Sequence, residues 1–407
     1  MVLPLPTEAA RLDAAPAPAA ERPRRVMIAT DTYPPDVNGA AYFTHRLATG
    51  LAARGNDVHV VCASDDGKAR TERVEGVLVH RLRSARLMVH PTMRVSVPTR
   101  LDVYVSAIAP DVVHTQGHFV VGRAAVAAAR RAGVPVVATN HFMPDNLFQF
   151  AHIPARLRAK AGDLAWRDFR RIFSRADHVT TPTRIAAGLL AEKGFAREVE
   201  AVSCGIDLSR FHPFAEPKAW ARKLFDLPDR PTVLFVGRLD EEKRLDEPIR
   251  ALPHVLNTTD AQLALVGSGS KREELERLAH RIGVGDRVRF LGFVPDEALP
   301  QAYAAADLFC MPGVAELQSI ATLEAMASGL PVVAADAMAL PHLVHPGENG
   351  HLYRPGDVLS LARHLTEILT SDDGRARMGA ASREIALTHD HQASLARFEA
   401  IYAELAR

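Results

Sequence analysis

The feature that most constrains the fold is an alternation of short apolar segments with helical segments, which runs twice along the chain. In the first half, stretches with helical periodicity separate apolar segments at 26–29, 58–61, 112–114, 134–138 and 179–180. The second half restarts the pattern at 232–236, 262–266, 288–293, 308–311 and 332–335. Strands that alternate with helices form parallel, doubly wound sheets. We therefore expect an α/β protein with two Rossmann-like domains.

Composition agrees with two domains. A chain of 407 residues is too long for one ordinary core, and 47% hydrophobic with 24% charged residues excludes a mostly disordered chain. No stretch approaches 18 uninterrupted apolar residues, which excludes a membrane-spanning helix. Cys62, Cys204 and Cys310 are odd in number and far apart, so they fit neither a disulfide framework nor a zinc site. We expect a reduced, cytoplasmic protein.

The chain divides into four expected segments. Residues 1–23 are rich in Ala and Pro and lack the apolar core of a signal peptide, so we expect a disordered tail. The first domain covers 24–205 and the second covers 206–390, and the link between them lies near 203–213. Residues 391–407 form an amphipathic helix.

Charge is distributed unevenly between the halves. Residues 1–205 hold 27 Lys and Arg against 19 Asp and Glu, whereas residues 206–407 hold 22 against 29. Either the domains differ in their solvated surfaces, or the first half meets an anionic partner such as phosphate or a membrane surface. The basic segment 156–175, which interleaves seven Lys and Arg with apolar residues, fits both an interfacial helix on anionic lipid and a surface helix with its apolar side packed inward.

Residues suited to anion binding directly follow expected strands. Gly39 lies in a turn that opens a helix, and backbone N–H groups at a helix start bind anions. Arg238 follows the strand at 232–236, and Lys243 begins the next helix. Two cations at one strand end suit a diphosphate, although both can instead pair with the acidic residues 240–242.

Two carboxylates follow the strand at 308–311. Glu316 lies in the loop after this strand, and Glu324 lies within the next helix. Carboxylates at separate depths beside one helix N-terminus can bind hydroxyls, while free N–H groups of the turn face the ligand.

Histidines also lie at adjacent strand ends in the first half. They are His114, His118 and His141. A histidine at such a place can orient or polarise a reacting group, whereas a lone histidine is more often structural.

Together these residues resemble the retaining glycosyltransferases of family 4, which have the GT-B fold, two Rossmann-like domains that face each other across a cleft. Within that family, the chain resembles phosphatidylinositol mannosyltransferases and diacylglycerol glucosyltransferases. The most specific element is the Glu-x7-Glu spacing of Glu316 and Glu324 after Arg238 and Lys243. The resemblance covers roughly residues 24–407 and includes Asn38-Gly39, Asp111-Val112-Val113-His114, the Gly205-Ile206-Asp207 link with Phe211 and Pro213, and Phe290-Leu291-Gly292-Phe293-Val294.

The resemblance implies a role for each matching position. Arg238 and Lys243 would hold the donor diphosphate, with the backbone at Gly39. Glu316 would contact the donor sugar, and Glu324 would bind the ribose hydroxyls. The remaining implied donor contacts are the backbone amides near Gln318, Ser319 and Ile320 for the sugar, and Gly292 and Phe293 for the nucleobase.

The resemblance also implies the reaction. A hexose would move with retention from a nucleotide-diphosphate sugar, GDP-mannose or UDP-glucose, to a hydroxyl acceptor, with a lipid among the candidates. No metal or other cofactor would be required, because the cations and a helix N-terminus stabilise the leaving diphosphate. Nucleic acid is not an expected partner. For the segment 156–175, peripheral contact with the anionic inner face of the membrane stays one of the two alternatives given above. The last helix would return to pack on the first domain.

One departure from the family concerns a histidine. Many relatives have a His-x-His pair whose second histidine lies near the reacting sugar, but the same positions here read His114, Thr115, Gln116. Either His118 takes that role through a loop shift, or Gln116 occupies the place. We expect His118, as a catalytic residue beside Arg238, Lys243 and Glu316.

Two other classes of function stay open. One is a nucleotide-sugar-binding protein without turnover. The other is a GT-B enzyme of another activity, such as an epimerase or phosphorylase, or one that acts on a small soluble acceptor, because the Glu-x7-Glu motif reports only the donor half of a site.

Overall fold

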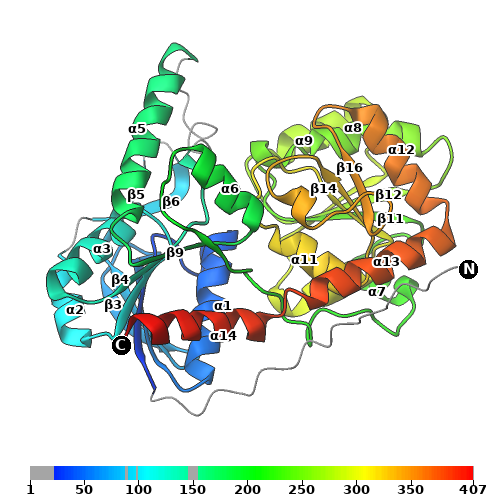
Figure 1. The fold of residues 1–407 in the computed structure, drawn as a ribbon. Coiled ribbons are helices and arrows are strands. Elements are labelled where there is room, and N and C mark those ends of the chain that lie inside the picture. Colours follow the sequence, from blue (N-terminus) through cyan, green and yellow to red (C-terminus); the bar gives the residue numbers. More distant parts are fainter. Residues whose placement is uncertain (1–22, 88–89, 98–99, 145–154, 407) are drawn as a thin grey trace, which may run out of the picture.

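Aliphatic strands build two separate sheets, as the sequence pattern predicts (Figure 1). The structure is a computed structural model and describes residues 23–87, 90–97, 100–144 and 155–406, with the side chains of 87–93 and 155–159 left aside. The predicted tail at 1–23 lies, apart from its last residue, outside the described residues. The expected α/β architecture with two doubly wound domains is confirmed.

The first sheet has eight strands and is parallel except for the antiparallel pair at one edge, β3 with β4. Its central strands are buried on both faces, as parallel strands between two layers of helices must be. In spatial order the strands are β10 (Glu200–Ala201), β9 (His178–Thr181), β8 (Val136–Thr139), β7 (Val112–Thr115), β1 (Arg25–Ala29), β2 (Asp57–Ala63), β4 (Val77–Leu82) and β3 (Arg70–Val74). A separate antiparallel pair is formed by β5 (Ser84–Leu87) and β6 (His90–Ser96).

The second sheet has six strands, all parallel. In spatial order they are β13 (Val288–Gly292), β12 (Gln262–Val266), β11 (Thr232–Val236), β14 (Leu308–Met311), β15 (Val332–Ala335) and β16 (Gly350–Tyr353). In order along the chain this reads 3-2-1-4-5-6, the arrangement of a dinucleotide-binding domain.

Helices connect the strands of both sheets. Those of the first half are α1 (Gly39–Ala53), α2 (Asp102–Ile108), α3 (Val120–Ala132), α5 (Ala155–Phe173) and α6 (Arg184–Glu192). Those of the second half are α7 (Lys218–Leu224), α8 (Asp246–Val255), α9 (Arg272–Arg281), α10 (Leu299–Ala304), α11 (Ile320–Ala327), α12 (Val358–Leu369) and α13 (Asp372–Leu387). The last helix is α14 (His391–Leu405).

The last helix packs on the first domain. Phe398 and Tyr402 of α14 are fully buried in one cluster with Phe43 and Leu47 of α1. Figure 1 shows α14, in red, beside α1 under the first domain. The chain therefore crosses between the domains twice.

The two crossings run side by side. Ile206 donates its backbone N–H to the carbonyl of His389 (2.7 Å) and accepts from the N–H of His391 (3.0 Å). Gly205 has a φ of +70°, and a Cβ there would lie 2.7 Å from the Cα of His391. Only glycine fits this conformation and this approach. The link is thus a short, paired hinge between the domains.

Candidate active site

Sheet topology sets the location of the site. The strand order reverses between β1 and β7 in the first sheet, and between β11 and β14 in the second. In open α/β sheets, ligands bind beyond the carboxyl ends of the strands at this reversal. The predicted residues follow these four strands: Gly39 after β1, residues 116–118 after β7, Arg238 after β11 and Glu316 after β14.

Lys243 and Glu316 form an ion pair across the second reversal point. Lys243 lies at the end of a 3-10 turn, Glu241–Lys243, and its Nζ donates to Oε1 of Glu316. The two side chains are only 15% and 14% exposed. The loop is held by the N–H of Ala339, which donates to the carbonyl of Glu316 (3.0 Å). The structure therefore brings together two predicted residues that are 73 positions apart.

Arg238 is held by two carboxylates. Its guanidinium donates to Asp240 and to Glu242, each at 2.6 Å. Asp240 is fixed in turn by the N–H and the hydroxyl of Ser270, both at 2.9 Å. The predicted alternative, pairing of Arg238 with the acidic residues 240–242, is therefore present. A guanidinium has five N–H donors, so donors remain for a further anion.

The charges of this cluster do not balance. Arg238 and Lys243 face three carboxylates, those of Asp240, Glu242 and Glu316. One oxygen of Glu242, Oε2, is buried without a hydrogen-bond partner. Both cations keep N–H donors for a further anion, and Lys243, which pairs with Glu316, has fewer carboxylate partners than Arg238.

Glu324 is buried beside groups of both domains. Its Oε2 accepts from the Tyr303 hydroxyl at 2.7 Å, and the residue is only 4% exposed. Burial raises the pKa of Glu324 to about 7, against the bond from Tyr303 and the fields of Arg46 and Arg210, which lower it. Because Arg46 belongs to α1, this carboxylate lies close to the first domain.

The side chain of Gln318 bonds the hinge. Its Oε1 accepts from the backbone N–H of Cys204 (2.7 Å), and its amide nitrogen donates to Ser203 (3.1 Å). Because its side chain is already hydrogen-bonded, Gln318 can offer only its backbone N–H group to a bound nucleotide-sugar. The next residue, Ser319, caps α11 by accepting from the N–H of Thr322 (3.2 Å), and the first amides of the helix, from Ile320 on, lack partners within it.

The predicted nucleobase loop follows β13. Gly292 has a φ of +71°, and its carbonyl accepts from the N–H of Gly267 (2.7 Å). A Cβ at Gly267 would lie 1.9 Å from the carbonyl oxygen of Gly237, so this glycine lets the turns after β11 and β12 pack back to back. Phe293 is 62% exposed, which leaves its ring available for stacking.

Gly39 begins α1 beside open space. The cap of this helix is Asn38, whose side chain accepts from the N–H of Ala41 (2.9 Å). A Cβ at Gly39 would meet no protein atom within 4 Å. The first amides of α1 therefore have both a free donor and room for an anion.

His118 lies inside an aromatic cluster. It is 4% exposed, and its ring centroid lies 4.4 Å from that of Phe119 and 5.2 Å from that of Phe169 in α5. Burial lowers the pKa of His118 to about 4. The structure therefore places the His118 ring among aromatic rings, and its role at the reacting sugar stays a prediction. Both nitrogens of His114 have partners, the Tyr402 hydroxyl at 2.7 Å and the Thr139 hydroxyl at 2.6 Å.

Gln116 lies at the strand ends instead. Its Oε1 contacts Nε2 of His141 at 2.8 Å, and that ring lies 4.6 Å from the ring of Phe43 in α1. Two buried amide nitrogens, Nδ2 of Asn140 and Nε2 of Gln116, have no hydrogen-bond partner. Buried polar groups of this kind are rare, and they are the donors that a hydroxyl-rich ligand would use.

In comparison with known proteins, two family models match the chain, one on each side of the link between the two sheets. The family model "Glycosyltransferase Family 4" matches residues 37–210, and "Glycosyl transferases group 1" matches residues 218–385. A GDP-mannose-dependent alpha-mannosyltransferase of Mycobacterium tuberculosis is 32% identical over 337 residues, which cover 82% of this chain and 84% of the relative. This chain belongs to glycosyltransferase family 4.

Other relatives of this glycosyltransferase share its fold or part of its sequence. A GDP-mannose-dependent alpha-(1-6)-phosphatidylinositol monomannoside mannosyltransferase of Mycobacterium tuberculosis is 36% identical over 53% of this chain and 58% of its own. The structure of sucrose-phosphate synthase from Thermosynechococcus elongatus superposes with a TM-score of 0.79, at 24% identity over 94% of this chain and 99% of the other. Anabaena HepE in complex with UDP-glucose superposes at 0.74, with 20% identity over 93% of this chain and all of the other. The glycosyltransferase therefore has the GT-B fold.

Several residues of the site were not found from the sequence of this glycosyltransferase. Tyr303, Arg46 and Arg210 are close to Glu324, but they lie at ordinary helix or loop positions that carry no motif. Asn140 could have been found, because it directly follows β8 and the same strand-end argument applies to it.

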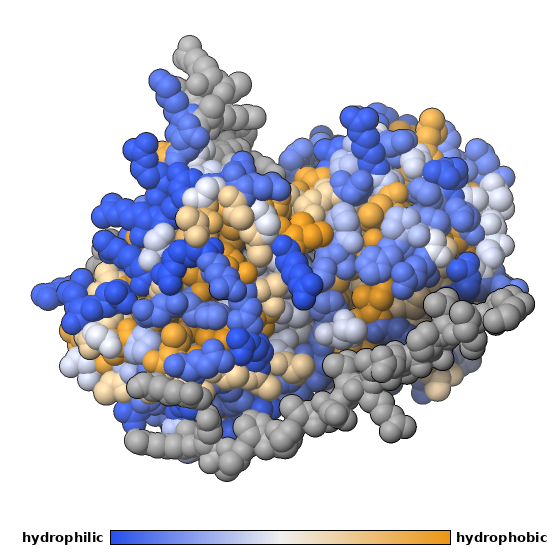
Figure 2. Space-filling view, in the orientation of Figure 1, coloured by the Kyte–Doolittle hydropathy of each residue, from blue (hydrophilic) through white to orange (hydrophobic). Residues whose placement is uncertain are grey.

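The basic helix of the glycosyltransferase packs its apolar side inward. Trp166, Phe169, Ile172 and Phe173 of α5 are buried in the first domain. Its described cations project outward with Leu164, which is 64% exposed, and Figure 2 shows a mainly hydrophilic surface on this helix. Arg156 and Arg158 lie where side chains are not described. No helix in the described part of the chain has both the length and the apolarity to cross a bilayer.

Proposed function

We propose that this glycosyltransferase is a retaining hexosyltransferase that moves mannose from GDP-mannose, or glucose from UDP-glucose, to a hydroxyl acceptor without a bound metal. The observation that carries the proposal is the Lys243–Glu316 pair, buried at the strand-order reversal beside Arg238. Of the two donors we favour GDP-mannose, because the mannosyltransferase that matches 82% of this chain is named as dependent on it.

The charges of the second domain would stabilise the leaving group. When the bond between the sugar C1 and the diphosphate oxygen breaks, negative charge develops on the nucleoside diphosphate. Arg238 and Lys243 would take up this charge together with the first amides of α1 at Gly39, in the place that a metal takes in other transferases. Lys243 would exchange its bond to Glu316 for one to the phosphate, which frees Glu316 to accept from sugar hydroxyls.

The remaining donor contacts follow from the same arrangement. Glu324 would accept from ribose hydroxyls in its ionised form, backbone amides at 318–320 would meet the sugar, and the loop at Gly292 and Phe293 would meet the base. In a front-side attack the acceptor oxygen bonds C1 on the face that the diphosphate leaves, and the departing phosphate oxygen takes the acceptor proton. The configuration at C1 is then retained.

On the acceptor side, we assign the position near the reacting sugar to Gln116 rather than to His118. The pair of Gln116 and His141 lies at the ends of β7 and β8, whereas aromatic rings surround His118. The unpartnered amide nitrogens of Gln116 and Asn140 would donate to hydroxyls of sugar or acceptor.

The proposed acceptor is a lipid-linked hydroxyl at an anionic membrane surface. It is supported by the phosphatidylinositol-related relative and by the outward cations of α5, which include Lys160, Arg167 and Arg171. Because the aromatic side of α5 is buried, contact with the inner face of the membrane would be electrostatic and salt-sensitive. Sedimentation with phosphatidylinositol vesicles at low and high salt tests it; binding that high salt does not reduce speaks against this contact.

The function itself is tested by donor binding followed by transfer. Thermal shifts with UDP, GDP, ADP and their sugar conjugates select the donor, and the labelled sugar conjugate is then incubated with inositol lipids in EDTA. We expect transfer with retention and no loss in EDTA. Donor binding without transfer or hydrolysis would favour a sugar-binding protein, and an epimerised or phosphorolysed product would favour another GT-B activity.

A further inference from the structure

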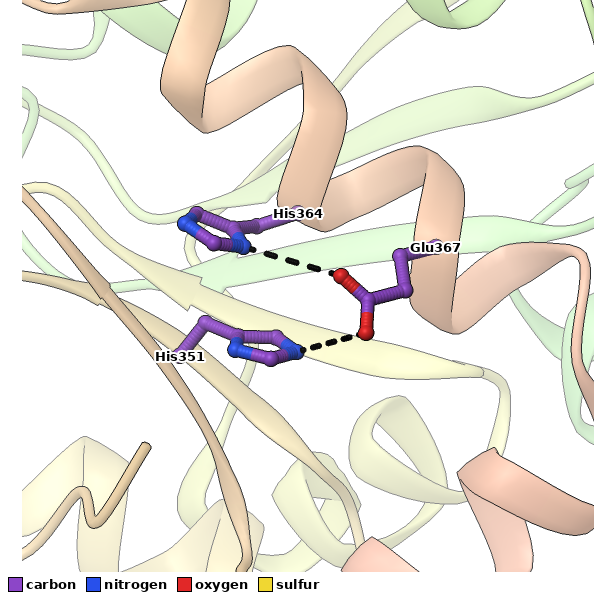
Figure 3. Close-up of side chains that lie close together, drawn as sticks. All are labelled: His351, His364 and Glu367. Atoms are coloured by element: carbon purple, nitrogen blue, oxygen red, sulfur yellow. Dashed lines mark ion pairs between the residues drawn. The ribbon is translucent and has the colours of Figure 1, made fainter. Parts of the chain in front are cut away.

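Three side chains converge at the outer edge of the second domain, away from the strand-end residues described above. His351 lies on the edge strand β16, and His364 and Glu367 lie on α12 (Figure 3). Nε2 of His351 lies 3.4 Å from Oε1 of Glu367, and Nδ1 of His364 lies 3.9 Å from its Oε2. Each oxygen of the Glu367 carboxylate thus faces one ring nitrogen, from His351 on one side and from His364 on the other.

These two nitrogens have no hydrogen-bond partner although both are buried. The side chains of His351 and His364 are only 12% and 11% exposed. Their rings stack with centroids 4.4 Å apart and planes 16° apart.

We propose that His351, His364 and Glu367 bind one divalent transition metal ion, Zn²⁺ in the first place, with water completing the coordination. The three ligand atoms lie within 4.8 Å of one another. Zinc with ligands at its usual distances holds them about 3.4 Å apart in a tetrahedron, so modest ring rotations close the site. Two imidazoles and one carboxylate suit Zn²⁺, Co²⁺, Ni²⁺ or Cu²⁺, whereas Mg²⁺ and Ca²⁺ require oxygen ligands.

We expect Arg363 to weaken metal binding, because its guanidinium contacts His364. Its Nη2 lies 3.2 Å from Nε2 of His364 and 3.4 Å from the hydroxyl of Ser360. When Nδ1 of His364 binds a metal, Nε2 carries the hydrogen and can no longer accept from a guanidinium. Arg363 is exposed and can turn away. Removal of its charge should therefore strengthen metal binding.

The site would be structural rather than catalytic. It joins the edge strand β16 to the helix that covers it, and none of its residues belongs to the donor site. A bound ion would stabilise the folded state in proportion to the logarithm of its free concentration. Chelation should accordingly lower the melting temperature and leave transfer unchanged, which separates this proposal from the proposed function.

The test is zinc titration by calorimetry of untagged, chelator-treated protein. We expect one Zn²⁺ per chain with a micromolar Kd, weakened at least about tenfold in Glu367→Gln and His351→Gln and tightened in Arg363→Ala. Glu348→Gln is the matched control, because His345 and Glu348 form an exposed pair of the same spacing that belongs to no group of three metal-ligating side chains among the described residues. Co²⁺ should give visible absorption bands in the wild type, and Mg²⁺ should not compete.

Glu367 is exposed, so its variant tests the site even if His351→Gln does not fold. Equal zinc affinity in the wild type and in Glu367→Gln would overturn the proposal, and so would an equal loss in Glu348→Gln. Absence of zinc binding to the wild type at micromolar concentration would overturn it as well.

Discussion

At the scale of single residues, the proposed donor site consists of charges that already have partners. Lys243 bonds Glu316, and Arg238 bonds Asp240 and Glu242. Such pairs keep the cations ordered and compensate their burial, since an unpaired buried charge is costly. We expect substrate binding to exchange the partner of Lys243, so the effect of each substitution depends on which partner it leaves behind.

Loss of the Lys243 charge should slow transfer without unfolding the protein. In Lys243→Ala one charge-assisted contact to the leaving diphosphate disappears, which costs roughly 1.5–3 kcal/mol, or roughly 10–150-fold in kcat. Lys271→Ala is the control, because Lys271 is likewise paired with glutamate, in its case Glu241 and Glu274, but lies at the start of α9. Steady-state kinetics and circular dichroism measure both; wild-type turnover in Lys243→Ala would remove the phosphate assignment.

Glu324 should make stability depend on pH in a defined direction. Its pKa is about 7 in the folded state and 4.5 when exposed, so between these values the folded state binds a proton that the unfolded state has released. The contribution of Glu324 to the free energy of unfolding therefore falls as the pH rises from 4.5 to 7. Above pH 7 the destabilisation by the buried charge reaches its full value.

Glu324→Gln removes this penalty. We expect the variant to gain nothing near pH 4.5 and up to about 3 kcal/mol above pH 7, and to bind nucleoside diphosphate more weakly because the ribose acceptor is lost. Urea unfolding at pH 5 and 8, together with calorimetry, measures both effects. If the free energy of unfolding differs between wild type and Glu324→Gln by the same amount at pH 5 and pH 8, the carboxyl is not buried as described.

Gln116 and His118 can be separated by matched substitutions. His118→Phe places a ring among the aromatic residues of α5, so we expect a folded, active protein. Gln116→Ala removes the donor at the strand end and leaves His141 unpaired, and we expect kcat to fall about tenfold or more. Transfer kinetics at a fixed donor concentration decide between them, and the opposite ranking would return the role to His118.

At the scale of elements, the apolar central strands were predictable, whereas the short or partly exposed strands were not. The five strands expected in the second half are all present, because each is a mainly apolar run bounded by turn residues. The short edge strands β10 and β16 and the strands β3 to β6 were missed. Residues 70–74 of β3 alternate between half-buried and exposed positions, so they lack an apolar run.

The site was predictable to the extent that strand ends define it. Arg238, Glu316 and Gly39 follow strands whose order fixes where a ligand binds. The side-chain partners were not predictable, because contacts such as Gln318 with Cys204, or Glu324 with Tyr303, depend on packing between segments far apart in the chain. The placement of His118 inside the aromatic cluster depends on α5 in the same way.

The N-terminus of α1 can be tested by adding one methyl group. In Gly39→Ala the new Cβ meets no protein atom, so we expect an unchanged melting temperature. The methyl would stand where the diphosphate approaches the helix, and we expect kcat/KM to fall about tenfold or more. Gly188→Ala in α6 is the control, because a Cβ there also meets open space; equal activity of the two variants would remove α1 from the donor site.

At the scale of the whole molecule, neither domain holds a complete site. The cations belong to the second domain, whereas Gly39 and Gln116 belong to the first. The loop before α11 links the halves, because Gln318 bonds the hinge at Cys204 and the carbonyl of Leu317 accepts from Thr183 of the first domain (3.0 Å).

The central claim is that both domains act on one diphosphate, and a double-mutant cycle on kcat/KM tests it most directly. Gly39→Ala and Lys243→Ala should together lose measurably less than the product of their separate losses, with a coupling of about 0.5–3 kcal/mol, because either change alone already prevents the diphosphate from seating. Gly188→Ala combined with Lys243→Ala should give no coupling. Losses that multiply in the first pair, as in the control pair, would contradict a donor site shared between the two domains.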